Sequence, residues 1–436
     1  GRINKAVLVI DEAQDMDKDE YVLVRALMNN NEEMRVIAVG DDDQNIYEFR
    51  GSDSRYMQAF IDEMQAVKYE MTENYRSRQQ IVSFANCFAQ GIRHRMKTSP
   101  CIAVSKDPGM VQITQYESEH LEIPLVNNVL ATYSNERACV LTNKNEEAAR
   151  IVGLLTKQGI RAKLIQSNEG FRFSNLAEVR YFLKHVNQNQ DSPIISDEQW
   201  MQAKQETLLN YETSTCLDYV KVFFEDFEKT NRTKYRSDLM EFAFESNLED
   251  FCGEDHQTVF VSTIHKAKGR EFDTVYMLLD GERAYNDEQI RKLYVGMTRA
   301  KQRLFIHCNT NVFSNIKTEG VEYRQDTNLY PLPEEITIPL THKDVYLDYF
   351  KGKKEQILKL RSGQPLCFDD GYLRLPSGGK VACISNKIRE ELQGWAEKGY
   401  FVKSAKINFI VAWKGKEDVE ETAVLLPELM LIKSMN

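Results

Sequence analysis

The sequence predicts an α/β fold with parallel strands and flanking helices, divided into several domains. Two short apolar runs carry this prediction, at residues 7–10 and 36–39, because mostly β-branched residues in an unbroken run are typical of strands buried on both faces. A helical stretch at residues 20–29 separates the runs and completes a βαβ unit. The length of 436 residues, 42% of them hydrophobic, allows two to four domains.

Acidic side chains follow both apolar runs. Asp11 and Glu12 follow the first run, and Asp41–Asp43 with Gln44 follow the second. Ligands of open α/β sheets bind at the carboxyl ends of the strands, so we expect Gln44 to lie near Glu12. One acid there can hold the Mg²⁺ of a nucleotide, and its neighbour can orient and deprotonate a water. The alternative interpretation is a pair of surface acids.

The charge is unevenly distributed along the chain. A formal net charge of −10 argues against a protein that coats nucleic acid through bulk charge, although local basic grooves can still bind it. Residues 1–70 carry eight Lys or Arg against sixteen Asp or Glu, whereas residues 71–110 carry six against two. The second window predicts a basic surface, and an ordinary solvated helix face is the alternative.

The cysteines and the apolar runs indicate the compartment. The eight cysteines form no C-x-x-C pair, so neither zinc nor an iron–sulfur cluster is predicted. There is no secretion signal and no apolar run near 18 residues. We therefore expect a cytoplasmic protein without a membrane partner.

Three further segments stand out: TENYRS at 72–77, VSTIHKAKGREFDTVYML at 261–278 and LYVGMTRAKQRLFI at 293–306. Together with DEAQD at 11–15 and GDDDQNIYEFRGS at 40–52, they resemble, in order, five motifs of superfamily 1 DNA helicases of the UvrD, Rep and PcrA type. The resemblance runs from about residue 5 to about residue 310. It implies RecA-like motor domains that use ATP and Mg²⁺.

The resemblance and the composition together suggest a domain plan. Residues 1–72 are expected to be a partial first RecA-like motor domain, and residues 73–186 with 255–310 the second. Residues 187–254 are expected to form a small helical insertion, 311–344 a linker and 345–436 a small β-rich carboxyl-terminal domain. That last domain should open with a helix at 345–360, contain another at 387–397, and turn at Asp370-Gly371 and Ser377–Gly379.

One motif of the resembling family does not occur in the sequence. There is no G-x-x-x-x-G-K-[ST] loop, which in the family lies upstream of the first acidic motif. We expect the chain to be the carboxyl-terminal part of a longer protein. By itself it should show negligible ATPase activity, because the loop's backbone amides and lysine hold the phosphates.

The resemblance assigns roles in phosphoryl transfer. Asp11 would hold Mg²⁺, Glu12 would act as general base, and Gln44 would read the γ-phosphate and the attacking water. Arg76 and Arg299 would reach the nucleotide from the second motor domain as arginine fingers, each typically worth about 10³ to 10⁵ in rate. A surface salt bridge is the alternative for either arginine.

Nucleotide and DNA contacts are implied as well. Tyr75 would stack on the adenine, with a core tyrosine as the alternative, and Glu271 would accept a hydrogen bond from the ribose hydroxyl. Arg270 stands where the family usually has leucine. Single-stranded DNA is expected to meet Tyr47, Phe49, Arg50, Thr263 and His265, with Phe49 in place of the usual tryptophan.

The sequence thus predicts part of an ATP-dependent DNA helicase or translocase on single-stranded DNA, and the resemblance implies 3′ to 5′ movement. Single/double-strand junctions are expected substrates, and the carboxyl-terminal domain is a candidate site for a protein partner. The alternative is a non-catalytic DNA-binding or scaffold module derived from a helicase. A helicase–nuclease and an RNA substrate are less supported.

Overall fold

The computed structural model describes residues 6–31, 33–165, 172–187, 192–251, 258–415 and 420–434. The chain divides into two compact units, residues 1–148 with 256–332 (unit 1) and residues 149–255 with 333–436 (unit 2). Both segments predicted as motor domains contribute to unit 1. The predicted helical insertion and the predicted β-rich domain fall together in unit 2, and the finer domain boundaries stay a prediction.

The first part of unit 1 is a small parallel sheet with two helices. Strands β1 (Val7–Ile10) and β2 (Arg35–Ala38) pair in parallel and are joined through α1 (Lys18–Asn29), which confirms the βαβ unit. Helix α1 begins with a capping box in which Asp17 and Glu20 accept hydrogen bonds from each other's backbone N–H. Helix α2 (Arg55–Met64) follows.

The prediction that the first strand is buried on both faces is wrong. Ile10 packs against the core formed by Ala13, Met16, Tyr21 and Phe60, but Val7 and Val9 are 48% and 60% exposed. Because β1 belongs to a sheet of only two strands among the described residues, helix packing covers a single face of it.

The second part of unit 1 is built on a large parallel sheet. Six of its strands belong to a seven-stranded sheet and run in the order β11-β5-β10-β9-β6-β8, and all the pairings among these six are parallel. This confirms the predicted parallel sheet. The bounds are β5 Met110–Tyr116, β6 Ala138–Thr142, β8 Thr258–Thr263, β9 Phe272–Leu279, β10 Ala300–Cys308 and β11 Val321–Asp326.

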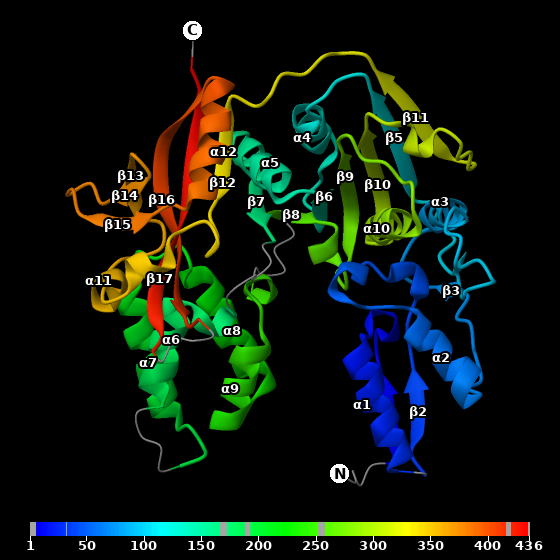
Figure 1. Cartoon of the computed structure of the whole chain (residues 1–436), viewed down its shortest axis with the longest axis horizontal. Helices are drawn as coiled ribbons and strands as arrows, with labels where there is room; N and C mark the ends of the chain where they lie inside the picture. The colour runs from blue at the N-terminus through cyan, green and yellow to red at the C-terminus, as the bar shows by residue number, and fades with distance from the viewer. Residues whose placement is uncertain are drawn as a thin grey trace. The chain divides into compact units, whose positions relative to one another are not determined.

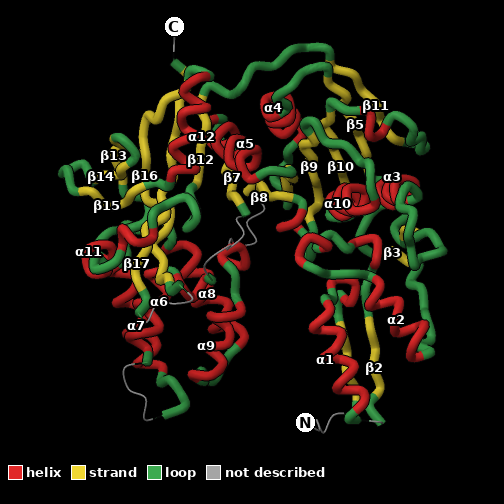
Figure 2. Tube along the Cα trace, viewed as in Figure 1, coloured by secondary structure: helices red, strands yellow, loops and turns green. Residues whose placement is uncertain are grey.

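Helices flank this sheet, as Figure 2 shows in red beside the yellow strands. Helices α3 (Gln79–Ala89) and α10 (Asp287–Met297) pack against each other and against β10, while α4 (Glu122–Thr132) packs against β9. Two short strands, β3 (Glu73–Asn74) and β4 (Ile102–Ala103), pair in parallel before the large sheet begins. Helix α5 (Asn145–Lys157) contains the division between the two units.

Unit 2 begins inside α5, continues through β7 (Arg161–Leu164) and then forms a helical layer with an aromatic core. The helices are α6 (Ala177–Val186), α7 (Asp197–Asn210), α8 (Leu217–Thr230) and α9 (Arg236–Glu245). Phe182, Trp200, Phe223 and Phe227 are buried and pack ring to ring between them. The predicted helical insertion at 187–254 lies partly outside the described residues.

The rest of unit 2 is a mainly antiparallel sheet around the long hairpin β16–β17 (Figure 1). The strand order is β12-β17-β16-β13-β14-β15. The predicted turn at Asp370-Gly371 is confirmed: both residues have positive φ, 44° and 75°, and link paired strands. The bounds are β12 Glu335–Pro339, α11 Lys354–Leu358, β13 Pro365–Asp369, β14 Tyr372–Arg374, β15 Lys380–Cys383, α12 Asn386–Glu397, β16 Tyr400–Trp413 and β17 Thr422–Lys433.

Two segments differ from their predicted form. Residues 311–344, expected to be a linker, contain β11 and β12. The helix expected at 345–360 is a 3₁₀ turn at Leu347–Phe350 followed by the short α11, because Gly352 between them has a φ of 74°. Among the described residues, no helix combines the length and apolarity needed to cross a bilayer.

Candidate functional site

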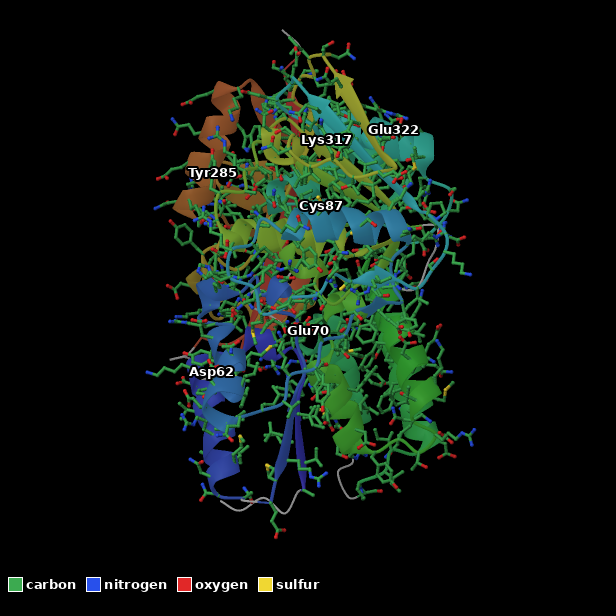
Figure 3. The ribbon with its side chains drawn as sticks, turned by 90° about the vertical axis from the view of Figure 1, so that its right-hand side faces the viewer. Asp62, Glu70, Cys87, Tyr285, Lys317 and Glu322 are labelled. Carbon is green, nitrogen blue, oxygen red and sulfur yellow. The ribbon has the colours of Figure 1, made fainter. Side chains whose placement is uncertain are left out.

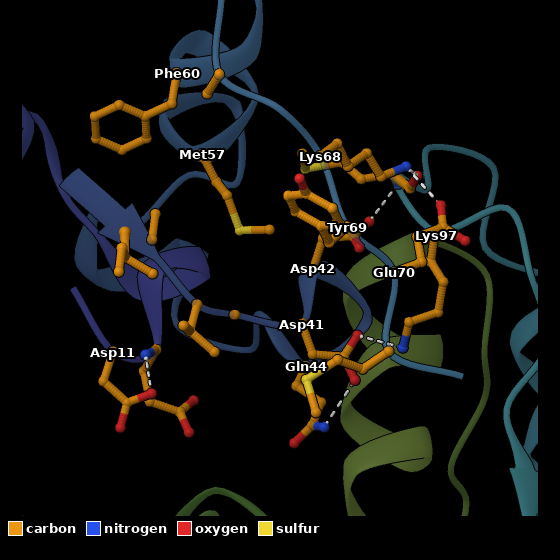
Figure 4. A pocket seen from close by; sticks show the side chains of 18 of the residues that line it. Asp11, Asp41, Asp42, Gln44, Met57, Phe60, Lys68, Tyr69, Glu70 and Lys97 are labelled. Carbon is orange, nitrogen blue, oxygen red and sulfur yellow. Dashed lines mark hydrogen bonds and ion pairs between the residues drawn. The ribbon is translucent and has the colours of Figure 1, made fainter. Parts of the chain in front are cut away.

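A cavity of about 1360 Å³ opens at the carboxyl ends of β1 and β2 in unit 1. Figure 4 shows Asp11 on one side of it and Asp41 with Gln44 on the other. The cavity gathers six residues that the sequence singled out from four separate motifs: Asp11, Glu12, Gln44, Tyr75, Arg76 and Glu271.

Glu12 sits at a sharp bend where β1 ends. Its φ of 50° and ψ of 40° place it in the left-handed region, which few residues other than glycine adopt. The bend is held because the backbone N–H of Ala13 donates to the carbonyl of Val39 over 2.9 Å. The exposed carboxylate of Asp11 accepts a hydrogen bond from the Glu12 backbone N–H, and both acids line the cavity.

Gln14 connects Glu12 with the second motif. Its Nε2 donates to Glu12 Oε2 over 2.6 Å, and its Oε1 accepts from the Asp41 backbone N–H over 2.9 Å. Gly40 passes so close that a Cβ there would lie 2.4 Å from Gln14 Oε1. Sequence reasoning missed Gln14, although its place inside DEAQD was a signal.

Gln44 continues this chain of hydrogen bonds to the second part of unit 1. Its Nε2 donates to Asp41 Oδ2 over 2.9 Å, and its Oε1 accepts from Arg299 Nη2 over 2.8 Å. Five residues therefore link the predicted general base to the predicted arginine finger, in the order Glu12, Gln14, Asp41, Gln44 and Arg299, with Asp41 taking part through both its backbone N–H and its carboxylate.

Arg299 is 1% exposed and is fixed by its own backbone surroundings. Its Nε donates to the carbonyl of Val295 and its Nη1 to that of Arg270. Burial, and then the nearby positive charge of Arg76, lower the pKa of Arg299 to about 10. The guanidinium thus stays charged at neutral pH, and its hydrogen bonds hold it beside Gln44.

Arg76 and Glu271 are ion-paired with each other, with side chains 34% and 31% exposed. Glu271 also pairs with Lys301 over 3.0 Å. Burial favours a raised pKa for Glu271, but the hydrogen bond from Lys301 and the charge of Arg76 outweigh burial and lower the pKa. The sequence analysis expected Arg76 to face the phosphates and Glu271 to face the ribose of a nucleotide. In the structure the two side chains form an ion pair with each other.

The Tyr75 ring is 74% exposed, so it is not the core tyrosine of the alternative interpretation. Its hydroxyl donates to Glu73, and this hydrogen bond raises the tyrosine pKa. An exposed ring in the cavity wall is free to stack on a planar ligand.

Four of the residues expected to contact DNA form an aromatic and cationic cluster. The rings of Phe49 and His265 meet edge to face at 5.8 Å, and Tyr47 donates from its hydroxyl to the His265 carbonyl. The Arg50 guanidinium lies over the Tyr47 and Phe49 rings at 5.2 and 5.5 Å. Phe49 is 64% exposed, which leaves a face of its ring for a base. The fifth residue, Thr263, is buried at the end of β8.

The His265 imidazole is held in its neutral form. Burial lowers its pKa, and the positive charges of Lys292 and Arg50 lower it further. At neutral pH the cluster's positive charge therefore comes from Arg50 and not from His265.

Sequence reasoning also missed Lys268. Its side chain is 7% exposed, pairs with Asp15 and lies 3.6 Å from Glu12 Oε2. Its ammonium also lies 5.0 Å from the centre of the Tyr47 ring. One cation thus contacts both the acidic bend and the aromatic cluster.

A further set of contacts involves residues 93–99, here termed the acid-held segment. Arg95 Nε donates to Asp43 over 2.8 Å, the Met96 backbone N–H to Asp42 over 2.6 Å, and Lys97 Nζ to Asp41 over 3.1 Å. Two basic side chains of the predicted basic window, Arg95 and Lys97, are thus paired with two of the three consecutive acids.

Carboxylates also hold both ends of the acid-held segment. Asp287 accepts from the backbone N–H groups of residues 93 and 94, and Glu70 from those of residues 98 and 99. Figure 3 shows Glu70 between Asp62, on α2, and Cys87, on α3. The run of three acids was visible in the sequence. Nothing in the sequence indicated that residues 95–97 would be its hydrogen-bond partners.

The comparisons with known proteins identify the family of this chain. The model of the UvrD-like helicase C-terminal domain matches residues 69–199 and 194–311, and that of the UvrD/REP helicase N-terminal domain matches residues 2–65. Because the first match covers more than half of the chain, the chain belongs to the UvrD-like helicase family.

Individual relatives are distant. YjcD of Bacillus subtilis is 23% identical over 426 residues, covering 77% of this chain and 55% of that protein. The Gabija protein GajB of Bacillus cereus is 23% identical (71% and 64%), and the ATP-dependent DNA helicase Rep of Buchnera aphidicola is 24% identical (80% and 68%). The chain spans a little over half to two thirds of the length of these relatives.

Solved structures of other proteins also match this chain. The C-terminal domain of a possible DNA helicase from Lactobacillus plantarum is 12% identical, with a TM-score of 0.30, over 57% of this chain and 98% of that one. At this TM-score the likeness supports no conclusion about the fold.

Proposed function

We propose that this chain forms part of an ATP-dependent motor that moves along single-stranded DNA and separates duplexes at single/double-strand junctions. The observation that supports it most is the chain of hydrogen bonds from Glu12 through Gln44 to Arg299. It joins a candidate base to a buried cation across two segments of unit 1, and phosphoryl transfer to water uses groups of both kinds.

Each polar group has a task in this proposal. Asp11 offers an exposed carboxylate, a ligand type suited to Mg²⁺, which when bound would neutralise charge on the phosphates of ATP. Glu12 would orient and deprotonate the attacking water. Arg299 and Arg76 would face the oxygens on which negative charge develops, since planar guanidinium groups match phosphate oxygens.

The nucleotide site would act on DNA through the short link between Gln44 and Phe49. These residues are five positions apart in the sequence, and the intervening Tyr47 is bonded to the His265 backbone. A shift of Gln44 when a nucleotide binds would therefore move the aromatic cluster. Coupling of this kind converts closure and opening around ATP into steps along a strand.

The test is ATP hydrolysis by the intact protein, meaning this chain with whatever its gene encodes on either side. Single-stranded DNA should stimulate turnover, and Glu12→Gln should lower kcat by roughly 10² to 10⁴, the usual contribution of a general base. ATP binding should persist in this variant, because Glu12 acts on water.

Asp62→Asn provides the matched control, since Asp62 is an exposed acid on α2 outside the cavity wall. It should hydrolyse ATP like the wild type. Absence of hydrolysis in the wild type, with single-strand binding intact, would overturn the proposal and support a non-catalytic DNA-binding module.

A further inference from the structure

A lysine without a role in the proposed chemistry lies in the wall of the cavity in unit 1. Lys301 is the second residue of β10, and its partly exposed side chain lines the cavity together with those of Arg76 and Glu271. Strands β9 and β10, which are neighbours in Figure 1, pair in parallel at this point. The Lys301 ammonium therefore belongs to the candidate nucleotide site.

A β-bulge lies at Lys301. Residues 300 and 303 of β10 pair with residues 272 and 274 of β9, so β10 holds one extra residue between the two pairs. Bulges re-aim side chains and occur often beside functional sites. Here Lys301 Nζ lies 3.0 Å from an oxygen of Glu271, the residue directly before β9. A cation of one strand thus meets the carboxylate that precedes the neighbouring strand.

Backbone contacts tie Lys301 to the segment that carries Arg76. The Lys301 carbonyl accepts from the backbone N–H of Arg78 over 2.9 Å. The carbonyl of Ala300 accepts from the Ser77 hydroxyl over 2.6 Å. Because Ser77 and Arg78 follow Arg76 directly in the sequence, the positions of the two cations are fixed relative to each other.

Glu271 is shared by these two cations. Arg76 Nε donates to Glu271 Oε1, and Lys301 Nζ pairs with Oε2. Burial raises the pKa of Glu271, but the hydrogen bonds and charges of the two cations outweigh burial and lower it. Each carboxylate oxygen has a further lone pair, so Glu271 can still accept a hydrogen bond from a ligand hydroxyl.

A bound nucleotide would affect the two cations differently. In the proposed function Arg76 faces phosphate oxygens, and a guanidinium binds carboxylate and phosphate oxygens through the same N–H groups. Bound ATP would therefore compete with Glu271 for Arg76. Lys301 has no phosphate contact in the proposed function, so its pairing with Glu271 can persist while Arg76 exchanges partners.

We propose that Lys301 is a positioning residue that keeps Glu271 aimed at the ribose of a bound nucleotide when Arg76 turns to the phosphates. The inference rests on the proposed function and names the residue on which recognition of the sugar depends. Without Lys301, Glu271 would follow Arg76 or turn to solvent, and the ribose hydroxyl would lose its acceptor. The site would then distinguish poorly between a ribonucleotide and an analogue that lacks the hydroxyl.

The test compares kcat/KM for ATP, 2′-deoxyATP and 3′-deoxyATP in the intact protein with saturating single-stranded DNA. A hydrogen bond to a charged group typically contributes roughly 10- to 100-fold, and the wild type should prefer ATP to one analogue by about that factor. Lys301→Met should lose most of this preference, because kcat/KM falls for ATP and stays the same for that analogue. Lys301→Arg should keep the preference, since it retains the positive charge.

Two further variants separate this role from a general structural one. If Lys301 acts through Glu271, Lys301→Met should cause no further loss of preference in a Glu271→Gln background. Gln302→Met is the matched control, because Gln302 Nε2 makes the adjacent contact between the same strands, to Asp273 Oδ1 over 3.1 Å, and lies outside the described wall of the cavity. This variant should keep the wild-type preference.

Three results would overturn the inference alone: a wild type that hydrolyses the three nucleotides equally well, an unchanged preference in Lys301→Met, or an equal loss of preference in Gln302→Met. Absence of ATP hydrolysis by the wild type would overturn the proposed function and this inference together.

Discussion

Lys97 holds the carboxylate that orients Gln44. Its ammonium contacts Asp41 Oδ1 while Gln44 Nε2 contacts Oδ2, as the dashed lines in Figure 4 mark. Burial opposes the charged form of Lys97, but Asp41 outweighs it and the lysine pKa is raised. A carboxylate only accepts hydrogen bonds, so Asp41 fixes which end of the Gln44 amide faces Arg299.

We predict that Lys97→Met lowers the DNA-stimulated kcat about tenfold, a cost of about 1.4 kcal/mol in the barrier, with little change in KM for ATP. Lys97→Arg should restore most of the rate. Steady-state kinetics of the intact protein measure both parameters. Asp287→Asn, which loosens the other end of the acid-held segment, serves as the control and should keep wild-type kcat. Equal losses in both variants would contradict a specific role for Lys97.

Phe49 presents the exposed ring of the aromatic cluster. Stacking of a base on an aromatic side chain is typically worth about 1 to 3 kcal/mol. Phe49→Ala should therefore weaken binding of an oligothymidine by about 5- to 150-fold, whereas Phe49→Trp should keep it. Fluorescence anisotropy at fixed salt gives the affinities, and unchanged binding by the alanine variant would place the strand elsewhere.

At the scale of elements, β5 and β10 share a buried polar contact. The Tyr116 hydroxyl and His307 Nδ1 are 2.8 Å apart, and burial lowers the pKa of His307 to about 3. The unfolded chain binds this proton near the ordinary pKa of 6.5, so the folded state binds it more weakly. Stability is therefore complete above pH 6.5 and is lost as the pH falls toward 3.

We predict that His307→Gln makes the melting temperature of the chain less sensitive to acid. The wild type should lose of the order of 1.4 kcal/mol of stability per pH unit from this group below pH 6.5, and the variant should not. Differential scanning calorimetry at pH 7.5 and 5.5 measures the difference. Parallel loss in both proteins would show that His307 does not titrate on unfolding.

Several elements were predictable because a local pattern determined them. The apolar runs of β1 and β2, the helical stretch between them and the Asp370-Gly371 turn each define their own conformation. The exposure of Val7 and Val9 was not predictable, because burial depends on which other segments pack on β1. Gly352 breaks a helix that the surrounding residues favour, and its effect is visible only once its φ is known.

The candidate site shows the same division. The expected closeness of Glu12, Gln44 and Arg299 could be predicted, because each residue lies in a short motif that indicates its role at the same site. The contact of Asp41 with Lys97 could not be found, because the two residues are 56 positions apart and lysine has many alternative partners. The pairing of Arg76 with Glu271 was missed for the same reason.

At the scale of the whole molecule, polar pairs join the two parts of unit 1. Arg299 bonds Gln44, Arg291 pairs with Glu48 over 2.8 Å, and Lys268 pairs with Asp15. Polar contacts can exchange partners with a bound nucleotide or with water, whereas an apolar interface would have to be re-exposed to move. This arrangement suits a motor in which nucleotide binding rearranges one part against the other.

We propose that Gln44 transmits changes between the candidate nucleotide site and the aromatic cluster. The most direct test is ATP turnover by the intact protein with and without single-stranded DNA, comparing wild type with Gln44→Ala. We predict that the variant still binds ATP and DNA but loses the stimulation of turnover by DNA. Normal stimulation in Gln44→Ala would contradict the account.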